Sequence, residues 1–349
     1  MYNRILVINL MYIGDLLFAT PLLRTLRANY PEAEIVLLAD KKNCDVVRYN
    51  PHISELIAID KKGYHNKLKN YLGVIADIRR RQFDLVINLH RNERASAIAA
   101  FSGAKKIIGF SAKGFGFFFD KVVHERTDIH QVDAYMETLK AVGVKRIDNQ
   151  GLEMWVDEKS QKKADEIWQY HFPDTSGNLR SSPKTPVIGI NTGGSWPTKR
   201  WTKSGFANLA DKILASGYGV VFFGGPMDKE DVEEILSLMV ERDSPQLVLL
   251  TGKTTLLEMA ALANKCTAFI SGDSGPMHIA VSQKVPVIAI FGPSDPLRYA
   301  PYGQKKSVIK SNQECLGCGE HSCVGHECMH GVTIDMVWSQ LAFIIKHPT

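Results

Sequence analysis

Residues 187–201 read VIGINTGGSWPTKRW, a short apolar run followed by a glycine-rich polar turn. The run Val187–Asn191 predicts a buried strand, and the apolar spacing of Ser204–Ala215 predicts the helix that follows the turn. The same order of strand, polar turn and helix occurs near the N-terminus, where residues 4–15 read RILVINLMYIGD. On both sides of these two stretches, predicted strands and helices alternate along both halves of the chain.

This alternation predicts two α/β domains, each a doubly wound parallel sheet with helices on both faces. The strands expected in the first half are Arg4–Leu10, Glu34–Ala39, Ile53–Ile59, Phe83–Leu89 and Lys106–Gly109. Those expected in the second half are Val187–Asn191, Gly219–Gly224, Leu247–Leu250, Ala268–Ser271 and Val287–Phe291. In such folds the ligands bind beyond the carboxyl ends of the strands.

The domain boundaries follow from a stretch rich in Pro, Ser, Thr, Asn and Gly, which is typical of a linker. We expect an N-terminal domain at residues 1–172, a linker at 173–186 and a C-terminal domain at 187–332. An amphipathic helix should end the chain within residues 333–349. A length of 349 residues agrees with two domains of ordinary size.

The composition is that of a globular protein, with 45% hydrophobic and 23% charged residues. It excludes a disordered, collagenous or disulfide-scaffold protein. No apolar run reaches the ~18 residues that a membrane-spanning helix needs. Asp15 interrupts the apolar stretch Ile5–Ala19, which favours a buried strand over a signal peptide. We therefore expect a cytoplasmic protein.

Positive charge is concentrated in the first half of the chain. The net charge is +5, and residues 1–150 hold 23 Lys and Arg against 16 Asp and Glu. A basic half suggests an anionic partner, such as a nucleic acid, a phosphorylated lipid or a charged sugar. Ordinary solvated side chains are the alternative interpretation.

The turn after the first strand contains Gly14 and Asp15 at the start of a helix. Asp15 could be an N-terminal cap, which is the commoner role of such a residue. It could also be a general base at the edge of a cleft. The turn has too few glycines for a dinucleotide-binding fingerprint.

The turn that follows Val187–Asn191 combines exposed backbone N–H groups, hydroxyls and positive charge, a combination that suits a phosphate. Its candidate residues are Thr192, Gly193, Gly194, Ser195, Thr198 and Lys199, next to Arg200. A polar surface loop with one buried tryptophan is the alternative.

A third turn begins a helix with strong start signals. Its residues are Asp273, Ser274, Gly275, Pro276 and His278. The N-terminus of a helix attracts anions, although a histidine at this place is more often structural. The nearby Gly252-Lys253-Thr254 resembles the end of a P-loop, but Leu247 stands where that motif requires glycine, so we do not expect ATP hydrolysis.

Four of the six cysteines gather near the C-terminus, at Cys315, Cys318, Cys323 and Cys328, with three histidines among them. The spacing is half of a zinc-ribbon pattern, so it indicates a possible structural metal site, with a loop of reduced thiols as the alternative. Another unusual segment, Lys113–Phe119, reads KGFGFFF. We expect its aromatic side chains to be buried, although such a loop could also touch a bilayer.

Taken together, these stretches resemble glycosyltransferase family 9, the ADP-heptose:lipopolysaccharide heptosyltransferases. The resemblance covers nearly the whole chain. Its N-terminal part is Ile5–Pro31 with Gly14-Asp15 and Thr20-Pro21. Its more specific part is C-terminal and includes Asn191–Trp201, Phe223–Pro226, Gly272–Ala280 and Phe291–Pro293.

The resemblance implies a GT-B architecture, in which two Rossmann-like domains face a central cleft and the last helix packs back on the N-terminal domain. It implies that the C-terminal domain binds a sugar nucleotide, ADP-heptose being the suspected donor, and that the N-terminal domain binds an anionic glycolipid acceptor. The transfer would invert the anomeric carbon and need no metal cofactor. Contact with the inner face of the cell membrane would be peripheral, and no nucleic acid is expected.

Residue by residue, the resemblance assigns Asp15 as the general base and Lys199 as the lysine that binds the diphosphate. Asp273, Ser274, Gly275 and His278 match the donor-binding start of a helix. Asp228 stands where some members have a glutamate implicated in nucleoside recognition. A leaving diphosphate with no metal beside it needs a cation and a helix N-terminus, which this set supplies.

Two other classes of function fit the same residues. One is a sugar-nucleotide epimerase or another GT-B enzyme, which would share the fold and the diphosphate site. The other is a non-catalytic sensor of a nucleotide sugar or a metal, built around the cysteine-rich loop. The sequence leaves open the exact sugar, the acceptor, the linkage and the oligomeric state.

Overall fold

The structure is a computed structural model that describes residues 2–148, 150–173, 185–304 and 307–347. The chain divides into two compact units, Met1–Trp155 and Val156–Thr349. This division falls before the expected boundary at 172, because helix α6 (Glu158–His171) packs against α9 (Leu256–Ala263) of the second unit. Residues 174–184 of the expected linker lie outside the described residues.

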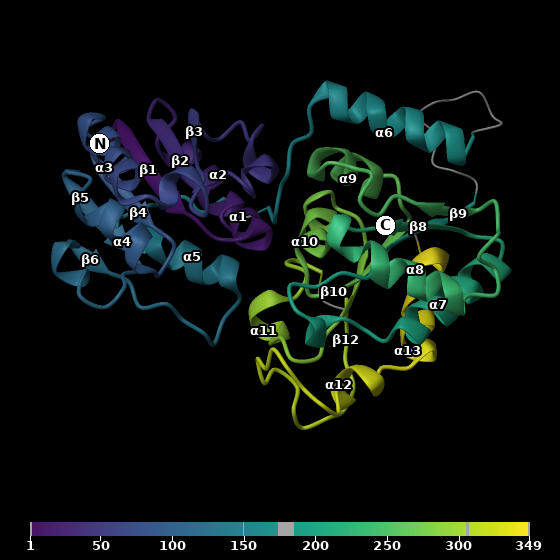
Figure 1. The fold of residues 1–349 in the computed structure, drawn as a ribbon. Coiled ribbons are helices and arrows are strands. Elements are labelled where there is room, and N and C mark those ends of the chain that lie inside the picture. Colours follow the sequence, from purple (N-terminus) through teal and green to yellow (C-terminus); the bar gives the residue numbers. More distant parts are fainter. Residues whose placement is uncertain (1, 149, 174–184, 305–306, 348–349) are drawn as a thin grey trace. The chain divides into compact units, whose positions relative to one another are not determined.

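The described residues of the first unit form a six-stranded sheet in the order β3-β2-β1-β4-β5-β6, with every neighbouring pair parallel (Figure 1). Its strands are β1 (Arg4–Asn9), β2 (Glu34–Asp40), β3 (Glu55–Ile59), β4 (Leu85–Asn88), β5 (Lys106–Gly109) and β6 (Lys121–Val122). Its helices are α1 (Ile13–Phe18), α2 (Thr20–Asn29), α3 (Leu68–Arg80), α4 (Glu93–Ala100) and α5 (Gln131–Lys140), with short 3₁₀ turns η1 (Cys44–Val47), η2 (Tyr64–Asn66) and η3 (Gly116–Phe118).

The second unit repeats this plan in the order β12-β11-β10-β7-β8-β9, again with parallel neighbours throughout its described residues. Its strands are β7 (Val187–Asn191), β8 (Gly219–Phe223), β9 (Leu247–Leu249), β10 (Ala268–Gly272), β11 (Val287–Ile290) and β12 (Val308–Ile309). With α6 and α9, its helices and 3₁₀ turns are η4 (Pro197–Lys199), α7 (Lys203–Ala215), η5 (Pro226–Asp228), α8 (Lys229–Leu238), α10 (Gly275–Ser282), α11 (Pro296–Tyr299), α12 (Glu327–His330) and α13 (Ile334–Lys346).

Counted within its own unit, each sheet has the strand order 3-2-1-4-5-6, which is that of the Rossmann fold. The expected fold class, two doubly wound parallel sheets of the GT-B kind, is confirmed. In this order the first and fourth strands are neighbours, and the chain leaves them in opposite directions. The loops after these two strands therefore open a crevice at the carboxyl edge of each sheet.

The central strands are buried on both faces, which explains why their sequences are continuous apolar runs. The residues from Ile5 to Ile8 have no exposed surface, and the same holds for Ile188, Ile190 and Ile270 in the second sheet. The C-terminal helix α13 contributes Val337 and Leu341 to the core of the second unit and packs on α7. Its expected return to the N-terminal domain stays a prediction.

The helix expected to begin after Gly14 and Asp15 is two helices in the structure. α1 ends at Phe18 and α2 begins at Thr20, with Pro21 in its first turn. Proline has no N–H to continue a helix from the preceding turn, but it fits the start of a new one.

The expectation that the aromatic segment Lys113–Phe119 is buried is wrong for its centre. Phe119 is buried, but Phe117 is 93% exposed and Phe118 is 43% exposed. The turn η3 reverses the chain within this run, so Phe115 and Phe119 pack on the core while Phe117 and Phe118 face outward. No helix within the described residues is long and apolar enough to cross a membrane.

Candidate functional site

The crevice of the first sheet lies between the loops that follow β1 and β4. Asp15 is in the first turn of α1, directly after the β1 loop, and is partly exposed. One carboxylate oxygen accepts the backbone N–H of Tyr12 at 3.4 Å, and the other lies 3.5 Å from the hydroxyl of the buried Tyr135. The carboxylate is thus held in place by a cap and a phenol, while part of its surface stays accessible.

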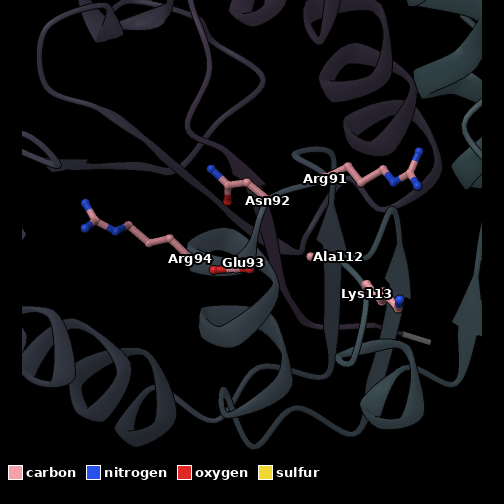
Figure 2. A pocket seen from close by; sticks show the side chains of 6 residues that line it. All are labelled: Arg91, Asn92, Glu93, Arg94, Ala112 and Lys113. Atoms are coloured by element: carbon pink, nitrogen blue, oxygen red, sulfur yellow. The ribbon is translucent and has the colours of Figure 1, made fainter.

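Basic side chains surround two adjoining cavities at this edge of the sheet. A cavity of about 500 Å³ is lined by Arg91, Asn92, Glu93, Arg94, Ala112 and Lys113. Figure 2 shows Arg91 and Lys113 extending to one side and Arg94 to the other. A second cavity, of about 300 Å³, shares Asn92 and Arg94 and is also lined by Leu10, Met11, Tyr12, Lys61, Lys62 and His90. We call the two together the basic pocket.

The cations of the basic pocket are held to different degrees. Arg94 donates to the carbonyl of Lys61 at 2.6 Å and to Asn66 at 2.9 Å. Lys61 lies 3.0 Å from Asp40. Arg91 is exposed and forms no ion pair within the described parts of the chain. The pocket therefore offers a fixed positive wall at Arg94 and Lys61, and the free guanidinium of Arg91 can close on an anion.

His90 is the uncharged group among these cations. It follows β4, and its Nδ1 atom is buried and has no hydrogen-bond partner among the described residues. Burial, together with the nearby charge of Lys61, lowers the pKa of His90 to about 4. The imidazole is therefore neutral at physiological pH and can exchange hydrogen bonds with a neutral hydroxyl group.

The crevice of the second sheet has a buried charged cluster in place of an open basic pocket. Lys199, in the turn after β7, lies 2.5 Å from Asp273, which follows β10. His278, one turn into α10, lies 3.8 Å from the other oxygen of Asp273. Burial of Asp273 opposes its ionisation, but the His278 hydrogen bond and the charge of Lys199 outweigh it and lower the pKa of Asp273 to about 2. Asp273 is therefore ionised, and Lys199 is paired before any ligand arrives.

A buried polar network fixes the start of α10. Ser274 caps the helix by accepting the N–H of Met277 at 3.3 Å. The amide of Asn191 donates to Ser271 and Ser274 at 3.1 and 3.2 Å, so the network joins β7 to β10. The Oδ1 atom of Asn191 and the hydroxyl of Thr192 are buried but have no partner within the described residues. Such orphaned polar atoms are costly unless a ligand or water satisfies them.

Gly193 is required by a close contact with the loop after β8. A Cβ atom at Gly193 would lie 2.6 Å from the carboxylate of Asp228. Asp228 is buried, and it accepts the backbone N–H of Gly225 at 2.8 Å. The structure thus brings Asp228 to the expected phosphate loop and gives it a structural contact there.

The remaining candidates of this region differ in their accessibility. Gly194, Gly275 and Pro276 are partly exposed, and Ser195 is exposed. Thr198 is buried, and its hydroxyl donates to the carbonyl of Glu320 at 2.7 Å. A ligand of this turn would therefore find the hydroxyl of Ser195 more accessible than that of Thr198.

The cysteine-rich loop braces the turn that carries Lys199. The ring of His321 stacks on that of Trp196 with the centroids 3.9 Å apart. The ammonium of Lys199 lies 4.0 Å from the centroid of the Trp196 ring. A nitrogen of His326 lies 2.6 Å from the carbonyl of Thr198. These contacts join segments that are far apart in sequence. The position of Lys199 therefore depends on the cysteine-rich loop.

The thiols of this loop form no preformed metal site. Cys315, Cys318 and Cys323 are exposed and Cys328 is buried. Burial and the neighbouring thiols of Cys315 and Cys318 raise the pKa of Cys328 to about 11. Across the described ranges, no three His, Cys, Asp or Glu side chains are arranged to hold a metal ion.

Sequence reasoning missed the basic pocket. Its signal was present, because HRNER at residues 90–94 directly follows an expected strand, where ligands bind in this fold. The brace from His321 had no such signal, since it depends on tertiary packing across more than a hundred residues.

Comparison with known proteins places most of the chain in one family. Residues 72–328 match the sequence profile of glycosyltransferase family 9 (heptosyltransferase). The lipopolysaccharide core heptosyltransferase OpsX of Haemophilus influenzae is 28% identical over 314 residues, which are 88% of this chain and 84% of that protein. Lipopolysaccharide heptosyltransferase 2 of Escherichia coli is 27% identical over 88% of both chains.

A solved structure of a family 9 glycosyl transferase from Veillonella parvula is also similar. It is 33% identical, covers 99% of this chain and 98% of its own, and superposes with a TM-score of 0.87. The ADP-heptose heptosyltransferase II of E. coli shares the fold, with a TM-score of 0.79 at 23% identity.

The lowered pKa of His90 predicts how stability depends on pH. The unfolded chain takes up this proton near pH 6.5 and the folded chain only near pH 4, so acid favours unfolding across that window. Between pH 7 and pH 5 the wild type should lose about 1–2 kcal/mol more unfolding free energy than His90→Gln does. Urea unfolding at both pH values measures this, with the exposed His124→Gln as control. Equal losses in wild type and His90→Gln would show that His90 titrates normally.

Proposed function

This chain belongs to glycosyltransferase family 9, the heptosyltransferases, and we propose that it moves a heptose from ADP-heptose onto an anionic core glycolipid, with inversion and without a metal cofactor. The family makes the chain a glycosyltransferase. The observation that carries the finer proposal is the chemical contrast between the two sheet crevices. One presents a carboxylate beside an open basic pocket, and the other a buried lysine beside a helix N-terminus.

The basic pocket supports the acceptor proposal. The similar proteins are named as heptosyltransferases of lipopolysaccharide and its core. Phosphate or carboxylate groups on an acceptor of that kind would pair with Arg91, Arg94 and Lys113. Arginine is suited to this task, because its guanidinium binds phosphate and carboxylate in a bidentate manner.

Asp15 is the proposed general base. It would accept the proton of the acceptor hydroxyl as that oxygen forms a bond to the anomeric carbon of the donor. The bond from this carbon to the diphosphate breaks as the new one forms, and its electron pair leaves with ADP. Attack opposite to the leaving group inverts the anomeric carbon. The cap and the Tyr135 contact supply the fixed position that a base needs.

Lys199 and the start of α10 are proposed to stabilise the leaving diphosphate. The lysine is held by Asp273 and by the Trp196 face, so it needs no reorganisation when charge develops on the leaving oxygen. Thr192, Gly193, Gly194, Ser195, Thr198, Ser274, Gly275, Pro276 and His278 are the proposed donor-binding residues around it. Asp228 stays a proposed contact for the nucleoside.

Removing the charge of Asp15 should separate catalysis from donor binding. Asp15→Asn should lower kcat by roughly 10²–10⁴-fold, the usual contribution of a general base. The dissociation constant of ADP should not change, because residue 15 is in the first unit and the proposed donor-binding residues are in the second. The asparagine can also keep the cap to the N–H of Tyr12. Steady-state kinetics and calorimetry measure the two quantities, with Asp45→Asn as a matched control. Full turnover in Asp15→Asn would leave Asp15 as a cap only.

Lys199 should contribute to binding of the diphosphate and not of the nucleoside. Lys199→Ala should weaken the binding of ADP by about 10–100-fold, as expected for the loss of a charge-assisted hydrogen bond. It should weaken the binding of adenosine by less than about twofold. Because this variant leaves Asp273 charged and buried, the pair Lys199→Met/Asp273→Asn removes both charges and serves as the folding control. Equal losses for ADP and adenosine would contradict the role.

The exposed guanidinium of Arg91 should bind an anionic group of the acceptor. Arg91→Gln should raise the apparent KM for the acceptor by about tenfold at low salt and flatten its dependence on ionic strength. Arg80→Gln, which removes an exposed arginine of the same unit, is the control. An unchanged KM and salt dependence in Arg91→Gln would favour a neutral glycan as acceptor.

A further inference from the structure

An exposed aromatic cluster lies at the edge of the first sheet, outside the residues that the proposed reaction uses. Phe117 is 93% exposed, and Phe118 and Phe101 are each 43% exposed. The ring of Phe118 lies 5.7 Å from that of Phe117 and 5.4 Å from that of Phe101. We call residues 111–122 the aromatic loop. Large aromatic side chains gathered on a surface mark an interaction site.

The aromatic loop is built to hold these rings outward. Backbone hydrogen bonds join Phe118 to Phe115 at 3.0 Å and Phe119 to Gly116 at 3.1 Å, which closes the turn η3. Phe115 packs against the core and Phe119 belongs to it, so both ends of the turn are anchored. The outward position of Phe117 therefore follows from the loop's own packing.

Positive charge flanks the aromatic cluster. Lys113 and Lys121 are exposed at the two ends of the aromatic loop, and Arg79 lies against the turn at Gly103, next to Phe101. Within the described ranges of the chain, none of these three cations forms an ion pair. Apolar rings beside uncompensated cations are the combination that binds an anionic lipid surface, with rings at the headgroup level and cations on the phosphates.

The aromatic loop is also continuous with the basic pocket. Ala112 and Lys113 line the larger cavity together with Arg91, and the same segment leads within a few residues to Phe117. A surface that rested on this loop would therefore lie beside the pocket proposed for the acceptor.

We propose that the aromatic loop docks this protein on an anionic bilayer, so that the basic pocket meets glycolipid headgroups at the membrane surface. The proposal rests on the proposed acceptor class. A second copy of the chain is a poorer occupant, because a two-fold contact would bring Lys113 and Lys121 against like charges. A bilayer of anionic lipids complements both the rings and the cations.

Co-sedimentation of the full chain with lipid vesicles tests this docking. Vesicles of phosphatidylethanolamine and phosphatidylglycerol should bind the protein, and phosphatidylcholine vesicles should bind it much less. Phe117→Ser should weaken vesicle binding by roughly tenfold, and Lys121→Glu should weaken it by about fivefold or more. The effect of Lys121→Glu should disappear at high salt, because salt screens the attraction of lysine to anionic lipid. Phe117→Trp should retain binding. Matched controls elsewhere on the surface are Phe343→Ser and Lys159→Glu, which should bind as wild type does.

Turnover separates this proposal from the proposed function. With a lipid-free, water-soluble acceptor fragment, Phe117→Ser should react as wild type does, whereas with acceptor embedded in vesicles its apparent KM should rise. Vesicle binding without any transfer would leave the docking surface intact and overturn the function. Equal vesicle binding by wild type, Phe117→Ser and Phe343→Ser would overturn the docking, as would a dimer in light scattering that Phe117→Ser dissociates.

Discussion

The parallel strand order of each sheet is the constraint on which the rest of the molecule depends. Because strands one and four of each unit are neighbours, the loops after them meet at one edge, and most of the candidate residues lie in these loops. Asp15 follows β1 and His90 follows β4, so the two residues lie at the same edge of the first sheet. Lys199 and Asp273 meet after β7 and β10, 74 residues apart in sequence. The repeated backbone plan thus supplies two sites, and the side chains give each its own chemistry.

The two crevices handle charge in opposite ways. The cations of the first remain partly solvated, so they can attract an anion over a distance but are screened by salt. In the second, Lys199 and Asp273 are buried and neutralise one another, and a ligand there must share an existing pair. The first arrangement suits a large, variable acceptor. The second suits a small leaving group that must be held in one geometry while charge develops on it.

Much of this organisation could be predicted from the sequence. Apolar runs indicate buried parallel strands, and the polar turns after them indicate the carboxyl edge of the sheet, where ligands bind. The structure divides the chain after Trp155, because α6 packs against α9. The sequence could not indicate this contact, since an amphipathic helix does not reveal its packing partner. The exposure of Phe117 was missed for a similar reason, since the direction of a ring depends on how a turn closes. The stack of His321 on Trp196 joins distant segments, and no local pattern encodes it.

We propose one inverting transfer, between a nucleotide sugar and an anionic acceptor, that uses the residues of both crevices. Proton NMR of a reaction between ADP-heptose of defined anomeric configuration and a phosphorylated core acceptor, with EDTA present, tests it most directly. We expect a glycoside of inverted configuration, one ADP released for each glycoside formed, and no ADP release without acceptor. Retained configuration, release of ADP without acceptor, or loss of transfer on chelation would contradict it.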